Sequence, residues 1–455
     1  MKRFLTAALL VTAFAPAARA EGYQINTLSA RQNGMGHTGV ALHLGSESQI
    51  FNPAGLTYLN DNVELTGSLT GIFATASATL PDGTRYSTDN SPSTPMSATA
   101  GFSIYDNFKA GVAFYTPYGS GINWTDSWPG AVLNQSVSLK TFTLQPTLAW
   151  SPLKGLSVGA GLMLTWGNVN LDKGLVEPSS FNTMQQLLIG MGMLPAGAYQ
   201  PYGPTTIPAS INLTGKANVA VGVNVGVMYD ITEQWTVGAS FRSRMNMNVK
   251  AGTASLKFAN THAENILDNR LGLLNQSQFK ASMPCPEVWK FGVAYRPVKG
   301  LVVALDAQLT GWSAYKALDI NFLDEALASY DQHIEKNYKN SWTFSAGAQY
   351  ALTPRFDLRC GLMVDTSPVS ASHYNPETPG MTKINPSVGF SFRPIDAISI
   401  DASFLYVAGL GADNRSCTYP DILLTALGGT PVGKTFTADY HVHAFNPSIG
   451  VTARF

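Results

Sequence analysis

Arg242 and Arg244 are the residues whose type and spacing most directly suggest a chemical task. They stand two positions apart in the stretch FRSRM, close to Ser240. Because side chains alternate between the two faces of a β-strand, both guanidinium groups would share the face of the serine. Two cations on one face can hold a carboxylate, and Arg393 is the next candidate for that role. Salt bridges to acidic residues of the protein are the alternative, and the sequence leaves both open.

Two apolar stripes predict a binding surface. In FNTMQQLLIGMGMLPAGAY the apolar residues, Phe181 among them, recur at the spacing of one helix face, and AENILDNRLGLLNQ repeats the pattern. Two short amphipathic helices could therefore face each other across an apolar groove, where flexible methionines adapt to varied ligands. The alternative is that the stripes pack only on each other, as a lid. The candidate binding residues are Met184, Leu187, Leu188, Met191, Ile266, Leu267, Leu271 and Leu274.

Binding without catalysis is the chemistry that these residues favour. Each CH₂ group removed from water contributes about 0.8 kcal/mol, so a long acyl chain supplies several kcal/mol by burial alone. The motifs GxSxG, HExxH and the P-loop are absent from the sequence. His441 and His443 could share a strand face, as a metal site needs, but the alternation puts them on an apolar face. We expect no enzyme activity, no cofactor and no metal, with a lipid-modifying enzyme as the alternative.

The elements that must position these residues are strands with one polar and one apolar face. In AFNPSIGVTARF, Phe445, Ile449 and Val451 alternate with polar residues, and LKTFTLQPTLAW and NSWTFSAGAQY alternate in the same way. The polar faces are rich in Gly, Ser, Thr, Asn and Gln. Aromatic residues lie near strand ends, as in the interfacial girdle of a membrane barrel. We therefore expect the polar faces to point inward and the apolar faces toward lipid.

The number of strands and the lengths of the loops support a transmembrane barrel. Short connections alternate with long ones, as periplasmic turns alternate with outer loops, and both termini then lie in the periplasm. The fold class is an all-β membrane protein, a fourteen-stranded antiparallel barrel. The expected strands are 63–80, 94–105, 108–117, 137–151, 155–170, 213–230, 235–252, 278–296, 300–322, 338–352, 355–366, 382–394, 397–409 and 438–455.

Composition and the leading residues agree with an exported membrane protein. Residues 1–20 have the positive start, apolar run and A-x-A site of a signal peptide. Charged residues are only 13% of the chain, about half the usual share, and nothing suggests nucleic-acid binding. The three cysteines, Cys285, Cys360 and Cys417, do not form a disulfide framework, although one bridge is conceivable. The expected location is the bacterial outer membrane.

A barrel of fourteen strands needs something to fill its lumen. Side chains just fill an eight-stranded barrel, so a wider one requires another occupant. Residues 21–62 are rich in Gly and small polar residues and show no sustained strand, so we expect them to form a hatch in the lumen. Asn52, Pro53 and Gly55 give this segment a stiff turn. An ordinary turn before the first strand is the alternative.

The sequence resembles the outer-membrane long-chain fatty-acid transporter (FadL) family over essentially the whole mature chain. EGYQIN resembles the mature N-terminus of the family, SARQNGMGHTGVAL its small-residue plug segment, and FNPAGL its plug kink. Further blocks follow in the family's order, and the chain ends on Phe455. These blocks are FYTPYGSGINW, LQPTLAWSPLKGLSVGAGL, VGASFRSRM, LTGWSAY and LRCGLMVDTSPV.

The resemblance implies a function and roles for further residues. It implies that residues 63–455 form the barrel, that two long outer loops, 171–212 and 253–277, capture a hydrophobic substrate, and that a deeper pocket touches the N-terminus. Release would then be lateral, through a gap in the wall near strand three. By position, Asn52, Pro53 and Ala54 are the hatch kink, while Glu21, Gly22 and Tyr23 reach the pocket.

These inferences combine into one expected function with stated alternatives. We expect passive uptake, by a monomer, of long-chain fatty acids or similar hydrophobic molecules from the outside into the outer-membrane lipid. Uptake of other hydrophobes, such as aromatic hydrocarbons, is an alternative within the same family. A general porin is a third reading, which the hatch and the low charge disfavour.

Overall fold

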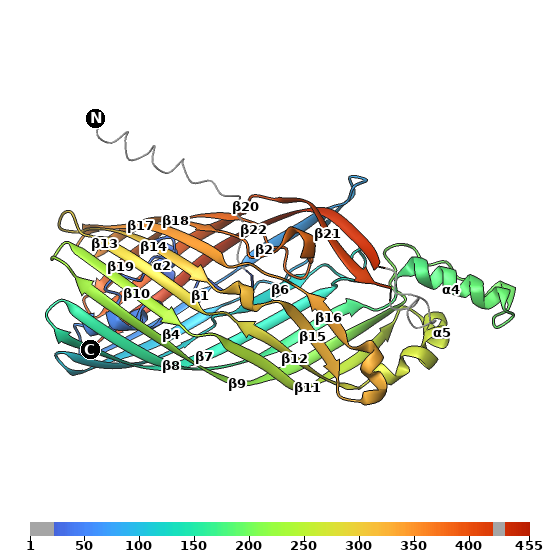
Figure 1. Ribbon diagram of the computed structural model, residues 1–455. Coiled ribbons are helices and arrows are strands. Elements are labelled where there is room, and N and C mark those ends of the chain that lie inside the picture. Colours follow the sequence, from blue (N-terminus) through green and yellow to red (C-terminus); the bar gives the residue numbers. More distant parts are fainter. Residues whose placement is uncertain (1–21, 422–432) are drawn as a thin grey trace.

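The protein is a single closed β-barrel with its N-terminal segment inside. The computed structural model describes residues 22–421 and 433–455, apart from the side chains of residues 269–271. The expected signal peptide, 1–20, and Glu21 lie outside the described residues. The elements follow the barrel axis, with helices α4 and α5 projecting beyond one end (Figure 1).

Fourteen antiparallel spans make up the described barrel, as the alternation predicts. Several spans are interrupted and therefore consist of two shorter strands. The first and last spans pair, with Glu64 opposite Arg454, so the sheet closes without an edge. The spans are β1 (Val63–Thr70) with β2 (Phe73–Thr79), β3 (Arg85–Ser87) with β4 (Met96–Tyr105), β5 (Phe108–Tyr115) with β6 (Gly119–Asn123), β7 (Ser136–Leu153), β8 (Leu156–Gly174), β9 (Ala209–Asp230), β10 (Trp235–Arg242) with β11 (Met245–Phe258), β12 (Gln278–Cys285) with β13 (Val288–Tyr295), β14 (Leu301–Thr310) with β15 (Ala317–Phe322), β16 (Gln332–Glu335) with β17 (Ser341–Thr353), β18 (Phe356–Asp365), β19 (Lys383–Ile395), β20 (Ile398–Gly409) with β21 (Ala412–Pro420), and β22 (Gly433–Arg454).

Short turns and long loops occupy opposite ends of the barrel. The short turns lie at the end where Val63 N–H donates to the carbonyl of Phe455, which we take as the periplasmic end. None of the helices in the described part of the chain is both long and apolar enough to cross a membrane. The helices are α2 (Ala30–Asn33), η1 (Gly45–Glu47), α3 (Ser48–Phe51), η2 (Pro53–Tyr58), α4 (Pro178–Gly190), η3 (Ala196–Ala198), α5 (Thr261–Leu271), η4 (Gly272–Leu274), η5 (Trp312–Ala314), η6 (Glu325–Tyr330) and η7 (Ala371–His373).

The strands run further outward than the sequence pattern indicated. Strand β8 continues to Gly174 and β9 begins at Ala209, so the loop expected at 171–212 is shorter. Strand β11 likewise continues to Phe258, inside the range 253–277 expected for the second loop. The strands continue because their inward faces are apolar there and bury each other, whereas the loss of the membrane pattern by itself predicts a loop.

Apolar side chains face outward over the part of the barrel that we call the membrane belt, defined by residues 142–150 of β7 and 158–166 of β8. On β7, Leu144, Leu148 and Trp150 are exposed, while the alternating residues Thr143 and Gln145 are buried. This confirms the orientation that the alternation predicts. Lipid would cover the exposed aliphatic and aromatic side chains.

Beyond the belt the polarity of the two strand faces is reversed. The inward side chains of β7 become apolar and the outward ones polar, although the strand keeps the same face inward. We call this part the extracellular extension, comprising 136–140 of β7, 168–174 of β8, 209–218 of β9 and 245–258 of β11. On β7, Val137 and Leu139 point inward and are buried, while Lys140 points outward and is exposed. The extension is therefore apolar inside and polar outside.

The hatch, residues 22–62, lies in the lumen of the belt (Figure 1). Polar side chains of the wall satisfy its backbone, as an irregular segment inside a barrel requires. Asp306 accepts from Gly39 N–H at 2.7 Å and from Val40 N–H at 3.1 Å. Ser240 donates to Phe51 O at 3.0 Å. The polar inner face predicted from the sequence thus serves as a set of hydrogen-bond partners for the hatch.

Candidate functional site

An apolar cavity occupies the extracellular extension. It holds about 890 Å³ of empty space, counting its open mouth. Val137 and Leu139 from β7, Leu213 from β9 and Val249 from β11 contribute to its wall. Its other lining residues are Tyr23, Ser120, Gly167, Asn168, Val169, Leu171, Ala217, Met247, Phe279, Ala281, Ser282, Met283, Tyr315, Leu318, Ile320, Glu377 and Thr378. This lining can take an apolar ligand by burial alone.

Tyr23 ends this cavity from below and is itself fully packed. Its ring makes edge-to-face contacts with Trp312, at 4.7 Å between centroids, and Tyr315, at 5.7 Å. Its hydroxyl donates to the carbonyl of Pro284. Burial raises the pKa of Tyr23 well above its usual value, so the phenol remains neutral. Gly22 lies against Trp312 so closely that a β-carbon would overlap the indole.

The third span of the barrel is interrupted where the hatch begins. Strands β5 and β6 are separated at 116–118, and the hatch fills part of the break by pairing with it. Ile25 N–H donates to Pro117 O at 3.0 Å, and Gly119 N–H donates to Tyr23 O at 2.9 Å. The start of the hatch therefore acts as a short extra strand beside the third span.

A second cavity reaches the wall at this interruption, and we call it the strand-three opening. It holds about 2470 Å³ of empty space including its mouth, and residues 90–96 and 118–123 are among those that line it. Phe142, an outward-facing residue of the belt, also lines it. Its lining thus includes residues from both faces of β7, the inward Thr141 and the outward Phe142.

The apolar cavity and the strand-three opening are neighbours separated by the start of the hatch. Ser120, Val137, Leu139 and Thr378 line both. Tyr23 faces the cavity, whereas Gly22 and Gln24 to Thr27 border the opening. Residues at the start of the hatch therefore border both spaces.

Glu377 is the one charged residue among the described residues that line the apolar cavity. Its carboxylate pairs with Lys336 at 2.9 Å, and the side chain of Lys336 is only 1% exposed. A buried pair of this kind brings no net charge to the cavity.

The three arginines singled out in the sequence lie elsewhere. Arg393 forms an ion pair with Asp357 in the charge network at the periplasmic end of the lumen. Arg242 is buried under the hatch, where its Nη2 donates to Ile50 O at 3.3 Å and its guanidinium lies over the ring of Tyr115. Arg244 forms a two-point ion pair with Glu287, at 2.7 and 2.9 Å. The two do not share a face, because the break between β10 and β11 at 243–244 changes the alternation.

The helices predicted from the apolar stripes form, as α4 and α5. Met184, Leu267 and Leu274 are buried together with Phe181, so the inner ends of the stripes pack on each other. Leu188 and Ile266 are partly buried against this cluster. Leu187 and Met191 are exposed near the outer end of α4, and the side chain of Leu271 lies outside the described residues.

The kink residues of the hatch anchor it to the wall. The side chain of Asn52 is buried, donates to Val40 O at 2.9 Å and to Val227 O of β9 at 3.1 Å, and accepts from Ala54 N–H. Pro53 follows it as the first residue of η2. At Gly226 of β9 a β-carbon would overlap the Asn52 side chain, so only glycine permits this approach.

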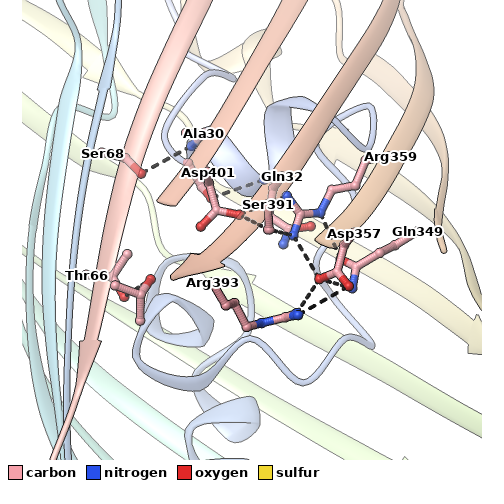
Figure 2. A network of polar contacts seen from close by, with 12 residues as sticks. Ala30, Gln32, Thr66, Ser68, Gln349, Asp357, Arg359, Ser391, Arg393 and Asp401 are labelled. Carbon is pink, nitrogen blue, oxygen red and sulfur yellow. Dashed lines mark hydrogen bonds and ion pairs between the residues drawn. The ribbon is translucent and has the colours of Figure 1, made fainter. Parts of the chain in front are cut away.

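A network of buried charges lies under hatch helix α2 at the periplasmic end of the lumen (Figure 2). Arg359 donates to Asp401 at 2.8 Å and to Gln349 at 2.8 Å, and it also contacts Ser391. Figure 2 shows the hatch residues Ala30 and Gln32 beside these side chains. The network joins four neighbouring strands, β17 to β20, and lies next to hatch helix α2 on the inner wall of the barrel.

The hatch also carries a buried acid close to this network. Glu47 of η1 is only 3% exposed. Burial, together with the negative charge of Asp401, raises its pKa to about 7.

Sequence reasoning did not identify the residues around Tyr23. Trp312 and Tyr315 lie in the block LTGWSAY, which was noted for its resemblance without a role. An aromatic pair directly after an amphipathic strand was the available signal. Glu377 and Lys336 come from two separate loops, and nothing in their sequence spacing indicates that they pair.

Comparison with known proteins assigns the family. Residues 9–455 match the family described as outer membrane protein transport protein (OMPP1/FadL/TodX). The chain belongs to this family. Outer membrane protein P1 of Haemophilus influenzae is 22% identical over 308 residues, which cover 67% of this chain and 64% of that relative. As an OMPP1/FadL/TodX protein, it is a β-barrel of the outer membrane from a family of outer-membrane transport proteins.

Solved structures of the OMPP1/FadL/TodX family share its fold. A FadL homologue of Pseudomonas aeruginosa gives a TM-score of 0.75 at 17% identity, covering 95% of this chain and all of the other. The toluene transporter TodX of P. putida gives 0.67 at 16% identity, covering 94% and 98%. At this identity the likeness shows the fold alone.

Proposed function

We propose that this protein takes up long-chain fatty acids or similar hydrophobic molecules across the outer membrane. The ligand binds among the outer loops around α4 and α5, moves into the apolar cavity above Tyr23, and leaves sideways into the bilayer through the strand-three opening. No chemical step is involved. The observation that carries the proposal is the contiguity of the cavity and the opening, with the hatch start between them.

The energetics of burial support a ligand with a long apolar part. The cavity wall is almost entirely aliphatic and aromatic, and each CH₂ group that it takes from water contributes about 0.8 kcal/mol. A sideways exit is favourable for the same reason. An apolar molecule that leaves through the wall enters the hydrocarbon of the bilayer, whereas an exit through the periplasmic end would return it to water.

Neutral hydrophobes, such as aromatic hydrocarbons, are the second candidate. The observation in their favour is that Glu377, the charged residue lining the described cavity, is an acid already paired with Lys336, so no free cation there meets a carboxylate head group. Two structurally similar proteins are named as toluene transporters. Competition of oleate and toluene for the purified protein separates the candidates.

The cavity can be tested with two adjacent residues of β9. Leu213 points into the cavity and is 4% exposed, while Thr214 points to the outside of the extension. Leu213→Asp should weaken oleate binding at least about tenfold. The introduced carboxylate would lose its hydration when the alkyl chain of oleate fills the cavity. Thr214→Asp should leave binding unchanged. Equal affinity in both variants, measured by calorimetry in nanodiscs, would exclude this cavity as the binding site.

The exit can be tested by locking the wall. A β-carbon at Gly121 would lie 3.1 Å from Ser93 Oγ, and both residues line the strand-three opening. Ser93→Cys with Gly121→Cys should therefore form a disulfide, whose Cβ atoms are about 4 Å apart. We expect the oxidised protein to bind oleate but not to transport it into cells, and a reducing agent to restore uptake. The single-cysteine variants are controls, and undiminished uptake by the oxidised protein would disprove the lateral exit.

A further inference from the structure

The segment between Glu177 and Lys216 contains no charged residue and no histidine. At the average composition of the chain, 13% charged, a segment of this length would hold about five charges. It forms α4, η3 and the returning chain up to β9. The neighbouring helix α5, by contrast, carries Glu264 and Asp268. The lack of charge is therefore particular to the α4 projection and not general to the outer surface.

The outer end of α4 is apolar and unpacked. Met191 is 70% exposed, Met193 69% and Leu187 48%, and we call these three residues the α4 tip. The helix projects from the extracellular end of the barrel, away from the membrane belt (Figure 1). The tip is therefore separated from the bilayer that surrounds its own barrel.

Hydrogen bonds connect α4 to the chain that returns toward β9. The buried amide of Gln185 donates to Gln200 O at 2.9 Å and accepts from Gln200 N–H at 3.0 Å. Asn182 makes the same two bonds with Tyr202, both at 2.9 Å. Lys434, at the base, contacts Glu177 and donates to Ser180. These contacts hold the tip at a fixed place outside the barrel.

The backbone N–H groups at the tip are hydrogen-bonded, as an apolar environment requires. The N–H groups of residues 191–194 all donate to carbonyls of Leu187, Leu188 or Ile189, with distances between 2.8 and 3.2 Å. An unpaired N–H in hydrocarbon costs several kcal/mol, so this pairing removes a main obstacle to insertion. The absence of charge removes the other.

We propose that the α4 tip inserts into the surface of an apposed lipid particle, such as a vesicle or a lipid droplet outside the cell. The proposal rests on the proposed function and deepens it, because it names the source from which the ligand is taken. Contact with a lipid surface would deliver the ligand to the outer loops without passage through water. With no charge on the projection, neutral lipid should suffice and salt should have little effect.

Flotation with vesicles tests the proposal on the full chain in nanodiscs. Phosphatidylcholine vesicles without fatty acid should carry the wild-type protein upward, equally at 0.05 and about 0.5 M salt. Met191→Ser with Met193→Ser should reduce the floated fraction about fivefold or more. Leu273→Ser with Leu323→Ser is the matched control, since both residues are exposed and apolar outside the tip, and it should float like wild type. Equal flotation of the two double variants, or no flotation of wild type, overturns the proposal.

A label at the tip supplies a local readout. An environment-sensitive fluorophore on Met193→Cys, with Cys360→Ser and Cys417→Ser, should shift to the blue and be quenched by brominated lipid present only in the vesicles. An unchanged spectrum contradicts insertion and leaves a protein partner or a second copy as the occupant of the tip. Oleate binding without vesicles should be the same in wild type and in Met193→Ser, which changes the one tip residue that is not a candidate binding residue. Loss of the tip contact and failure of the binding cavity are therefore separate results.

Discussion

The membrane belt and the extracellular extension are built from the same strands with opposite polarity. Along β7, the inward residues change from Thr143 and Thr141 in or next to the belt to Leu139 and Val137 in the extension, while the outward residues change from Phe142 to Lys140. Strand β8 changes in the same way after Trp166. On β7 and β8 the alternation continues without interruption across this boundary, so on these two strands the change lies in the chemistry of each face and not in its direction.

The difference shows that the surroundings on both sides of the wall determine the polarity of each face. In the belt, lipid lies outside and the backbone of the hatch lies inside, so apolar residues face out and hydrogen-bonding residues face in. In the extension, water lies outside and the empty cavity lies inside. One strand can therefore anchor the protein in lipid at one end and form an apolar binding wall at the other.

The largest expected effect comes from breaking a charge pair inside the belt. Asp401→Ala removes the nearer of the two carboxylates that pair with Arg359, at 2.8 Å against 3.9 Å for Asp357. Because the side chain of Arg359 is only 1% exposed, the change should lower the free energy of unfolding by about 3 kcal/mol. The control is Asp126→Ala in the outer loops, whose partner Lys257 lies at 3.1 Å with both side chains mostly exposed. That pair should contribute less than about 1 kcal/mol. Urea unfolding in vesicles measures both, and similar losses would contradict the distinction between the regions.

The second largest difference is expected when a charge is added to the outer surface of the barrel, since lipid surrounds the belt and water surrounds the extension. Leu148→Arg places a cation on the lipid-facing surface near the middle of the belt and should cost about 2–4 kcal/mol. Asn248→Arg, which is outward and exposed in the extension, should change stability by no more than about 0.5 kcal/mol. The same unfolding assay applies. A comparable cost at Asn248 would mean that lipid also covers the extension.

Added volume should show that the belt lumen is filled and the extension is not. Gly226→Leu collides with Asn52 and should displace the hatch kink at a cost of about 1–3 kcal/mol, with raised conductance in planar bilayers. Ala217→Trp, on the same strand, fills part of the cavity and should leave conductance unchanged while weakening oleate binding about tenfold. Raised conductance in the Ala217 variant would contradict a separate, empty cavity.

Much of the fold was predictable because its signals are local. The alternation of Phe445, Ile449 and Val451 with polar residues is enough to predict the last strand and its lipid-facing side, and the short turns between strands predict their number. The helices α4 and α5 follow from apolar spacing in the same way. The reversal of polarity at Leu139 and Lys140 was also present in the sequence, but it reads as the end of a strand unless water outside and a cavity inside are considered together.

The binding residues were less predictable because they come together only in space. The charged partner of Glu377 lies in another loop, and the rings around Tyr23 come from β14 to β15 and from the third span. Arg242 and Arg244 share a face in a regular strand, but the break at 243–244 separates them, and Glu287 pairs with one of them.

By itself the sequence determined a barrel of fourteen strands, its orientation in lipid and a leading segment without strands, since period-two alternation and turn lengths are properties of neighbouring residues. Only the tertiary structure decided which inner surface the hatch fills and which stays open, where the third span breaks, and which charges neutralise each other. Those outcomes depend on contacts between residues that are hundreds of positions apart, such as Asn33 with Ser448, and closure of the barrel is what brings them together.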